Sequence, residues 1–299
     1  TDAAGFTIGN KGYICGGYNG KTTRLADTWE YDIDNDWWTQ RADMPGTVRN
    51  AATGFPVGNK GYITTGYNPD QKYLADTWEY DPETNTWRQM DDFKGGARYY
   101  ALGFGIDNYG YVGTGYNDNY LKDFYRFDPT AAAGSQWTIV NGFGGQKRQG
   151  ATAFVIDGKA YVCGGQNNNS DVSDFWRFDP SAATPWTQLR DIANTSDDDY
   201  DDDYTSIVRS YGVSFVIDGK AYLTLGSTAG GSYYSNYWIY DPETDLWEGD
   251  DLTAFEGSTR IHAVCFSTGT RGIIATGGSG SSSYFDDTWE LKPYEYEEE

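Results

Sequence analysis

The chain is built of short segments in which aromatic and β-branched residues alternate with small or polar ones, a pattern typical of β-strands. Segments 151–157 ("ATAFVID") and 159–165 ("KAYVCGG") predict two such strands, and 174–179 ("DFWRFD") predicts a third. A tryptophan-bearing segment such as 85–90 ("NTWRQM") predicts a fourth. Turn chemistry separates the last two, because "DPET" at 81–84 and 241–244 has proline at the second turn position. The pattern therefore predicts a unit of four short strands, a to d.

This unit occurs six times. The hexapeptide "DTWEYD" stands at 27–32 and again at 76–81, and related hexapeptides begin at residues 123, 174, 236 and 287. Four other residue types recur with the same period. A phenylalanine (Phe6, Phe55, Phe104, Phe154, Phe215, Phe266) is followed seven residues later by a tyrosine (Tyr13, Tyr62, Tyr111, Tyr161, Tyr222), which Ile273 replaces in the sixth unit. A glycine stands four residues after the tyrosine position (Gly17, Gly66, Gly115, Gly165, Gly226, Gly277), and an arginine stands six residues before the phenylalanine (Arg49, Arg98, Arg148, Arg209, Arg260). A period of about 50 residues indicates a repeat architecture.

Four strands at this period are typical of a β-propeller. The segments "YICGGYNG", "DTWEYDPETNTW" and "YVCGGQNN" resemble the kelch-repeat family over all 299 residues, and the chain is similar to bacterial kelch proteins of the galactose-oxidase central-domain and sialate-mutarotase types. The resemblance implies an all-β fold, a six-bladed kelch β-propeller with four antiparallel strands per blade. We expect one domain, with blades at about 1–44, 45–93, 94–144, 145–193, 204–253 and 256–299.

The sequence departs from the repeat pattern in its first and last units. Blade six has no strand-d tryptophan, so 293–299 ("PYEYEEE") predicts a weak outer strand or none, and the way the ring closes stays open. The first unit would need its arginine before residue 1, so we expect a processed or trimmed chain that a signal or lipid anchor could have preceded.

Composition narrows the class of partner. A net charge of −22 argues against nucleic acid and anionic membranes, because both need clustered Lys and Arg. The sequence contains no apolar run of about 18 residues, so we expect no transmembrane segment. Strong acidity, abundant Tyr, Trp and Asn, and scarce Lys indicate an extracellular, periplasmic or cell-surface protein, which we expect to be a monomer. Cys15, Cys163 and Cys265 are expected to be small buried residues, not bridge partners.

One face of the propeller should carry the binding residues. Because the strands alternate in direction, the b–c loops, the d–a loops and the start of every strand a open on the same face. The positions just after the strand-b glycine are candidate ligand contacts: Tyr18 and Asn19, Tyr67 and Asn68, Tyr116 and Asn117, and Gln166 and Asn167. Units five and six have Ser227-Thr228 and Gly278-Ser279 there, so the rim is lopsided. Tyrosine and amide side chains suit sugar hydroxyls or a peptide backbone, although asparagines in loops often only form turns.

The arginine column allows two interpretations. It is either a ring of cations for an anionic ligand or, as its even repetition favours, a repeated tie between blades. The position two residues later varies completely (Ala51, Tyr100, Gly150, Tyr211, His262) and lies at the axial mouth of strand a. Tyr100, Tyr211 and His262 are therefore further ligand-binding candidates.

A long d–a connection before Arg209 carries "SDDDYDDDY", with six aspartates in Asp197–Asp203. A solvated acidic loop is the simplest interpretation. Calcium is the alternative, because oxygen-rich clusters suit it, although the spacing of a calcium-binding loop is missing. We expect no other cofactor or metal.

The sequence favours a binding module for a glycan or a protein partner over an enzyme. Copper chemistry of the galactose-oxidase type requires two histidines, and the chain has one. The alternative is a sialate-mutarotase-like or other sugar-modifying activity, which requires an acid/base pair beside a carboxylate-binding arginine, with Arg98, Arg209 and His262 as candidates. No nucleophile elbow, phosphate loop or zinc spacing is present, so no catalytic residue is assigned.

Overall fold

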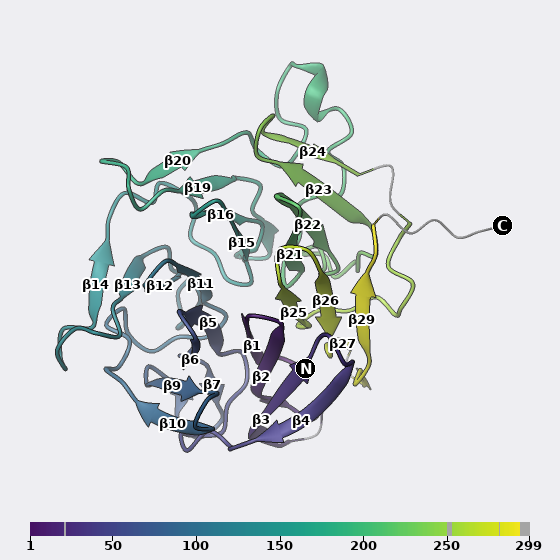
Figure 1. Cartoon of the computed structure of the whole chain (residues 1–299). Helices are drawn as coiled ribbons and strands as arrows, with labels where there is room; N and C mark the ends of the chain where they lie inside the picture. Colours follow the sequence, from purple (N-terminus) through teal and green to yellow (C-terminus); the bar gives the residue numbers. More distant parts are fainter. Residues whose placement is uncertain (21, 250–252, 281, 294–299) are drawn as a thin grey trace.

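The computed structural model describes residues 1–20, 22–249, 253–280 and 282–293. Six antiparallel sheets surround a central axis, as Figure 1 shows, and the fold class is confirmed as an all-β six-bladed propeller. Strand a of each blade lies nearest the axis, and strand d is the outermost strand in blades one to five.

The strands follow the predicted order in every blade. Blade one contains β1 (Ala4–Ile8), β2 (Lys11–Tyr18), β3 (Arg24–Asp32) and β4 (Trp37–Arg41), and blade two contains β5 (Thr53–Val57), β6 (Lys60–Thr64), β9 (Thr77–Asp81) and β10 (Thr86–Gln89). Blade three contains β11 (Leu102–Ile106), β12 (Tyr109–Gly113), β13 (Phe124–Phe127) and β14 (Trp137–Val140), and blade four contains β15 (Thr152–Ile156), β16 (Lys159–Cys163), β19 (Trp176–Phe178) and β20 (Trp186–Gln188). Blade five contains β21 (Val213–Ile217), β22 (Lys220–Thr224), β23 (Tyr237–Asp241) and β24 (Leu246–Glu248), and blade six contains β25 (Val264–Ser267), β26 (Gly272–Ala275) and β29 (Thr288–Leu291).

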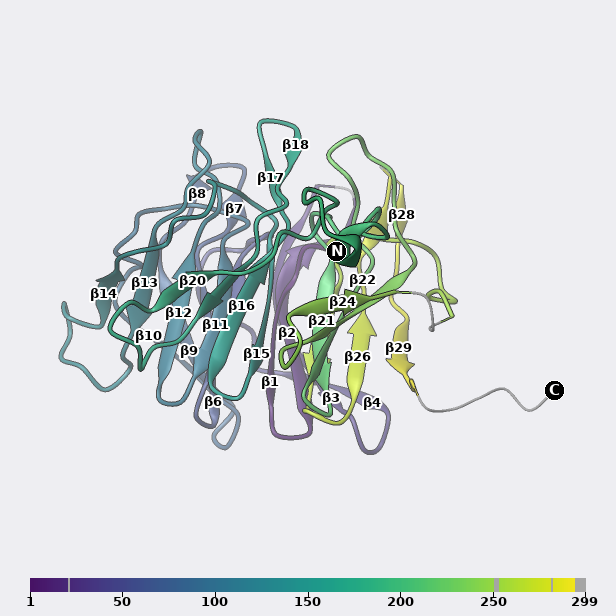
Figure 2. The same cartoon turned by 90° about the horizontal axis from the view of Figure 1, so that it is seen from above.

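The b–c loops form small hairpins in three blades: β7 (Tyr67–Asn68) with β8 (Lys72–Tyr73), β17 (Gln166–Asn167) with β18 (Ser170–Asp171), and β27 (Gly278–Ser279) with β28 (Ser283–Tyr284). Figure 2 shows that these hairpins and the first residues of the chain lie on the same side of the ring. A single 3₁₀ turn, η1 (Asp199–Asp201), lies in the acidic insertion. The part of the chain described contains no helix long and apolar enough to cross a membrane.

The phenylalanine and tyrosine columns are cross-strand neighbours. In blade one, Phe6 of β1 is directly opposite Tyr13 of β2, and their rings stack with centroids 5.2 Å apart. The same pairing recurs in blades two to five. Each pair also packs against the next blade, since a Cβ on Gly61 of blade two would lie 2.0 Å from the Phe6 ring. The columns therefore exist because two sheet faces meet at every seam.

The arginine column is structural. All five arginines are buried, and Arg49 shows the pattern, donating to the Asp76 carboxylate at 2.7 and 2.6 Å and to the carbonyl of Thr65. Its backbone pairs with the preceding blade through Leu25 and Gly17. Each arginine thus ties two blades together, and its guanidinium is not presented to a ligand. Arg209 differs, because its side-chain partner is Asn236 instead of an aspartate.

Blade six closes against blade one. Within the described residues its sheet has three strands, and the predicted outer segment at 293–299 lies almost wholly outside them. The Trp38 indole of β4 donates to the Thr288 hydroxyl at 3.1 Å and packs against Phe266. Trp37 at the start of the same strand does not pack into a seam, because 60% of its surface is exposed. The three cysteines are free; Cys15 and Cys163 are buried as expected, whereas Cys265 is only partly buried.

Candidate functional site

Six equivalent residues surround the axis at the start of each strand a, and we call them the axial ring: Asp2, Ala51, Tyr100, Gly150, Tyr211 and His262. Every member has a left-handed backbone, with φ between 50° and 63°, which is uncommon for residues other than glycine. The N–H of each member donates to the carbonyl of the member in the preceding blade, at 2.8–3.4 Å. Six backbone hydrogen bonds therefore close a circle around the axis. The circle holds the unusual conformation in place and directs the side chains toward a common centre.

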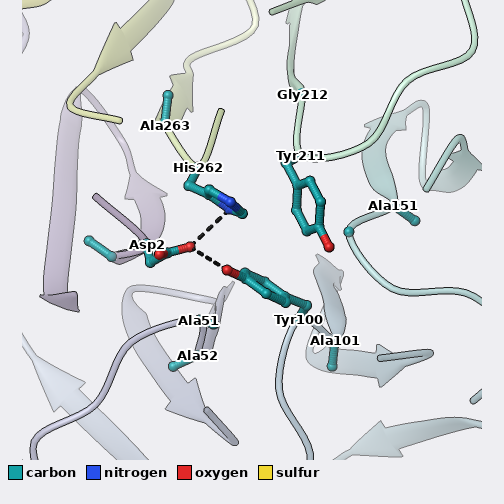
Figure 3. A pocket seen from close by; sticks show the side chains of 12 residues that line it. Asp2, Ala51, Ala52, Tyr100, Ala101, Ala151, Tyr211, Gly212, His262 and Ala263 are labelled. Carbon is teal, nitrogen blue, oxygen red and sulfur yellow. Dashed lines mark hydrogen bonds and ion pairs between the residues drawn. The ribbon is translucent and has the colours of Figure 1, made fainter. Parts of the chain in front are cut away.

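Large and small residues alternate along most of the axial ring. Ala51 separates Asp2 from Tyr100, and Gly150 separates Tyr100 from Tyr211. A Cβ on Gly150 would lie 2.4 Å from the Tyr211 ring, so glycine is required there for that ring to lie across blade four. The small members leave room for the large ones to meet over a cavity of about 130 Å³. Figure 3 shows Asp2, Tyr100, Tyr211 and His262 around this axial pocket.

Asp2 organises one side of the pocket. Its Oδ1 accepts a hydrogen bond from the Tyr100 hydroxyl at 2.8 Å and lies 2.9 Å from Nδ1 of His262. Burial alone would raise the pKa of the Asp2 carboxyl. The charge of His262 and the hydrogen bonds from His262 and Tyr100 outweigh this effect, so the pKa lies below its ordinary value. Burial and the neighbouring Asp2 hold the pKa of Tyr100 well above its ordinary value, so its phenol remains a proton donor.

Tyr211 forms the opposite side. Its hydroxyl oxygen accepts N–H groups from the Gln149 and Gln166 side chains, both at 2.6 Å. Burial raises the pKa of Tyr211, so this phenol is also neutral. The pocket rings contact one another: the centroid of the His262 ring lies 4.4 Å from that of Tyr211, and His262 stacks on Tyr100 with centroids 5.1 Å apart. The pocket therefore combines one carboxylate, one imidazole and two neutral phenols.

A tyrosine cluster extends from the axial pocket to the rim of blades two and three. Tyr99 is its centre. The ring of Tyr99 contacts that of Tyr100 in the pocket, with centroids 4.9 Å apart, and stacks on the Tyr73 ring, with centroids 5.6 Å apart. The remaining members are Tyr67, Tyr116 and Tyr120, which continue the chain of contacts at 5.0–6.4 Å. The Tyr73 hydroxyl donates to Asp118 of the next blade at 2.7 Å, which fixes the cluster across the seam.

Tyr18 is the rim tyrosine of blade one. The Arg24 guanidinium lies between the Tyr18 and Tyr67 rings, at 4.5 and 5.6 Å from their centroids. Nε of Arg24 also donates to Asn50 Oδ1 at 2.9 Å. Cation–π contacts of this kind join the tyrosines of blades one and two into one surface.

The predicted amide residues divide into two groups. Asn68 is buried, donates to the Val48 carbonyl and accepts the Asp70 N–H, so it shapes the loop. Asn19 accepts the Thr23 N–H, and Asn167 belongs to the β17 hairpin. Asn117 pairs through its backbone N–H with Asn119. Gln166 alone among these amides reaches the axial pocket, through the Tyr211 hydroxyl.

The acidic insertion is an ordered loop anchored between blades four and five. Asp201 is fully buried and accepts the N–H groups of Thr195 and Ser196, each at 2.9 Å. Tyr204 is buried beside it, and its hydroxyl oxygen accepts the backbone N–H of Trp247. The described residues contain no group of three His, Cys, Asp or Glu arranged to hold a metal. The one inward-facing aspartate thus serves the loop itself.

Sequence reasoning overlooked Asp2, together with Tyr73, Tyr99 and Tyr120. Asp2 could have been found, because every member of the axial ring stands four residues before the repeated phenylalanine, and Phe6 places that position at residue 2. Tyr99 directly follows the arginine column, where its side chain has no counterpart of the same type in other units.

Comparisons with known families agree with this geometry. The KLHDC2/KLHL20/DRC7 Kelch-repeats domain model matches residues 2–147, and the Kelch motif model matches residues 147–189. The chain belongs to the kelch-repeat β-propellers. A solved kelch-type propeller described as "Structure of YjhT" superposes with a TM-score of 0.77 over 96% of this chain and 93% of that chain. The two are 15% identical, so this likeness concerns the fold alone. None of the curated proteins compared matches the sequence.

Proposed function

We propose that this kelch protein is a binding module that holds a glycan on the face formed by its b–c and d–a loops, with one sugar unit at the axial pocket. The observation that carries the proposal is the continuous path of tyrosines from the rim to the axis. Tyr67, Tyr99 and Tyr100 contact one another in sequence, and Tyr116 branches from Tyr99. Aromatic faces with hydroxyl groups at their edges suit the alternating apolar faces and hydroxyls of a sugar chain.

The polar groups of the pocket also favour a ligand with hydroxyl groups. Asp2 is an acceptor, while the phenols of Tyr100 and Tyr211 can both donate and accept. The lopsided rim gives the ligand a direction, because tyrosines line blades one to three whereas Ser227 and Gly278 stand at the same position in blades five and six. Kelch domains are generally protein-interaction modules, and a protein partner remains the other occupant that the experiment must test.

A sugar-modifying activity is the second candidate, favoured by the contact of Asp2 with His262 beside a phenol. A sialate-mutarotase-like reaction would also need an arginine for the substrate carboxylate. Arg98 and Arg209 are buried and occupied by Asp123 and Asn236, respectively. This arrangement favours binding over that reaction.

The test is a glycan array with the intact protein, followed by calorimetric titration of the best ligand. Tyr67→Ala and Tyr116→Ala should each weaken binding by roughly 1–3 kcal/mol, as expected for aromatic contacts at a recognition site. Trp37→Ala is the matched control, because this exposed aromatic residue begins β4, directly after the c–d turn on the other face. Unchanged affinity in both tyrosine variants would overturn the proposal. Turnover of free sugar anomers, followed by NMR and abolished by Asp2→Asn, would instead support the enzyme.

A further inference from the structure

A second hollow, which we call the outer groove, lies between blades three and four near the periphery of the ring and has a volume of about 280 Å³. Blade three contributes Tyr111, Arg126, Thr138 and Ile139, and blade four contributes Phe178 and Pro185. Figure 1 shows β14 and β20, the outer strands beside it, at the edge of the molecule away from the axis. The outer groove is therefore separate from the axial pocket.

The corresponding position in blade two is filled by an ion-pair network. Glu79 of β9 lies opposite Arg88 of β10 in the sheet register, and Arg88 donates to it at 2.8 Å. The same carboxylate accepts Tyr62 at 2.7 Å and Lys60 at 3.1 Å. Blade one repeats this network with Glu30 and Arg41. The carboxylate and the cations satisfy one another there.

Blade three has an arginine where blade two has the glutamate of this network. Arg126 of β13 occupies the glutamate position, and the residue opposite it on β14 is Thr138. Tyr109 replaces the lysine, and its ring lies 4.4 Å from the Arg126 guanidinium carbon. Within the described residues no hydrogen bond or ion pair joins the Arg126 guanidinium to a carboxylate. The neighbouring Asp128 turns its Oδ1 to the Thr130 N–H and hydroxyl, at 2.9 and 2.7 Å.

Blade four leaves the other wall of the groove apolar. In blades two and five the residue equivalent to Phe178 is a tyrosine, whose hydroxyl bonds to a turn residue: Tyr80 to Asn85 at 2.8 Å and Tyr240 to Asp245 at 3.0 Å. Phe178 has no hydroxyl, and its ring packs edge-on against Tyr111 with centroids 4.9 Å apart. Ile139 stands beside it with 51% of its surface exposed. A guanidinium that is not hydrogen-bonded to a carboxylate thus borders an apolar hollow.

We propose that the outer groove binds a small aromatic carboxylate. The carboxylate would pair with the Arg126 guanidinium, whose planar N–H fork matches two oxygens. The aromatic body would lie against Phe178 and Pro185 and cover Ile139, removing apolar surface from water. The volume limits the ligand to a small molecule. This inference does not depend on the glycan proposal, because the two sites share no residue.

The test uses 4-hydroxyphenylacetate and its neutral amide, 4-hydroxyphenylacetamide, in an NMR titration that observes the Nε–H signals of the arginines. We expect the acid to bind in the millimolar range and to shift the Arg126 signal, and the amide to bind at least about tenfold more weakly because it lacks the charge. Arg126→Gln should lose a similar factor. The Arg88 signal in blade two, already paired with Glu79, is the internal control and should not move.

The double variant Arg126→Glu with Thr138→Arg installs the blade-two pair in blade three. It should fold, because Tyr111 could donate to the new glutamate as Tyr62 donates to Glu79, and it should lose binding of the acid. Equal binding of acid and amide, retention of binding in this double variant, or no binding by the folded wild-type protein would each overturn the proposal.

Discussion

Asp2 and His262 join the first blade to the sixth twice. The Asp2 N–H donates to the His262 carbonyl at 3.2 Å, and the Asp2 carboxylate lies 2.9 Å from His262 Nδ1. The same pair is therefore part of the backbone circle that closes the propeller and part of the wall of the axial pocket. Substitution of Asp2 should affect both stability and binding.

Asp2→Asn should lower the free energy of unfolding at pH 7 by about 1–3 kcal/mol, the usual effect of losing hydrogen bonds to a buried charge. The pKa of Asp2 is lower in the folded protein than in the unfolded chain, so its contribution is present above the ordinary carboxyl pKa. That contribution is lost as the pH falls through the lowered folded value. The difference in melting temperature between wild type and variant should therefore shrink in acid.

Asp34→Asn is the control for this measurement, because Asp34 is exposed on the other side of the ring, where Asn10 donates to it at 3.0 and 3.2 Å and Arg271 lies 3.4 Å away. A constant difference between wild type and Asp2→Asn down to the lowest accessible pH would show that the Asp2 charge does not matter.

Arg98→Ala should destabilise the fold by about 3–5 kcal/mol, because it leaves the partly buried Asp123 carboxylate without its bidentate partner and opens the seam. Chemical denaturation measures this loss. If the column instead held an anionic ligand, the variant would keep its stability and lose only binding.

Asn236→Asp should stabilise the protein. Burial lowers the pKa of Arg209 to about 10. Its partner Asn236 is neutral, whereas each of the other four arginines faces an aspartate. A carboxylate would supply the missing charge, and the Ser206 hydroxyl next to Asn236 could donate to it. We expect a gain of about 1–3 kcal/mol, the range for hydrogen bonds to charged groups. A lower melting temperature for this variant would contradict the electrostatic explanation.

Gly61→Ala should destabilise by about 1–3 kcal/mol or more, because its Cβ would lie 2.0 Å from the Phe6 ring in a packed seam. Gly230→Ala is the matched control, since its nearest neighbour would be Thr228 Oγ1 at 3.5 Å. Thermal melts of the two variants should differ clearly, and equal melts would show that the blades can separate to admit a methyl group.

The sequence alone determined the fold. Repeated residues report contacts that every blade makes, so the pairing of Phe6 with Tyr13, the buried arginine ties and the number of blades could be predicted from their spacing. The loop positions also predicted which face carries Tyr67, Tyr100 and His262. A regular period contains this information because each blade packs against its neighbours through the same contacts.

The tertiary structure decided which residues meet. Asp2 and His262 are separated by almost the whole chain and become neighbours only when the ring closes, and Tyr73 reaches Asp118 only across a seam. Asn68 looked equivalent to Tyr67 in the sequence, yet the turn of the hairpin directs it inward to the Val48 carbonyl. Spacing reports what the blades share, whereas a site depends on how their differences are brought together in space, and that arrangement exists only after the ring has formed.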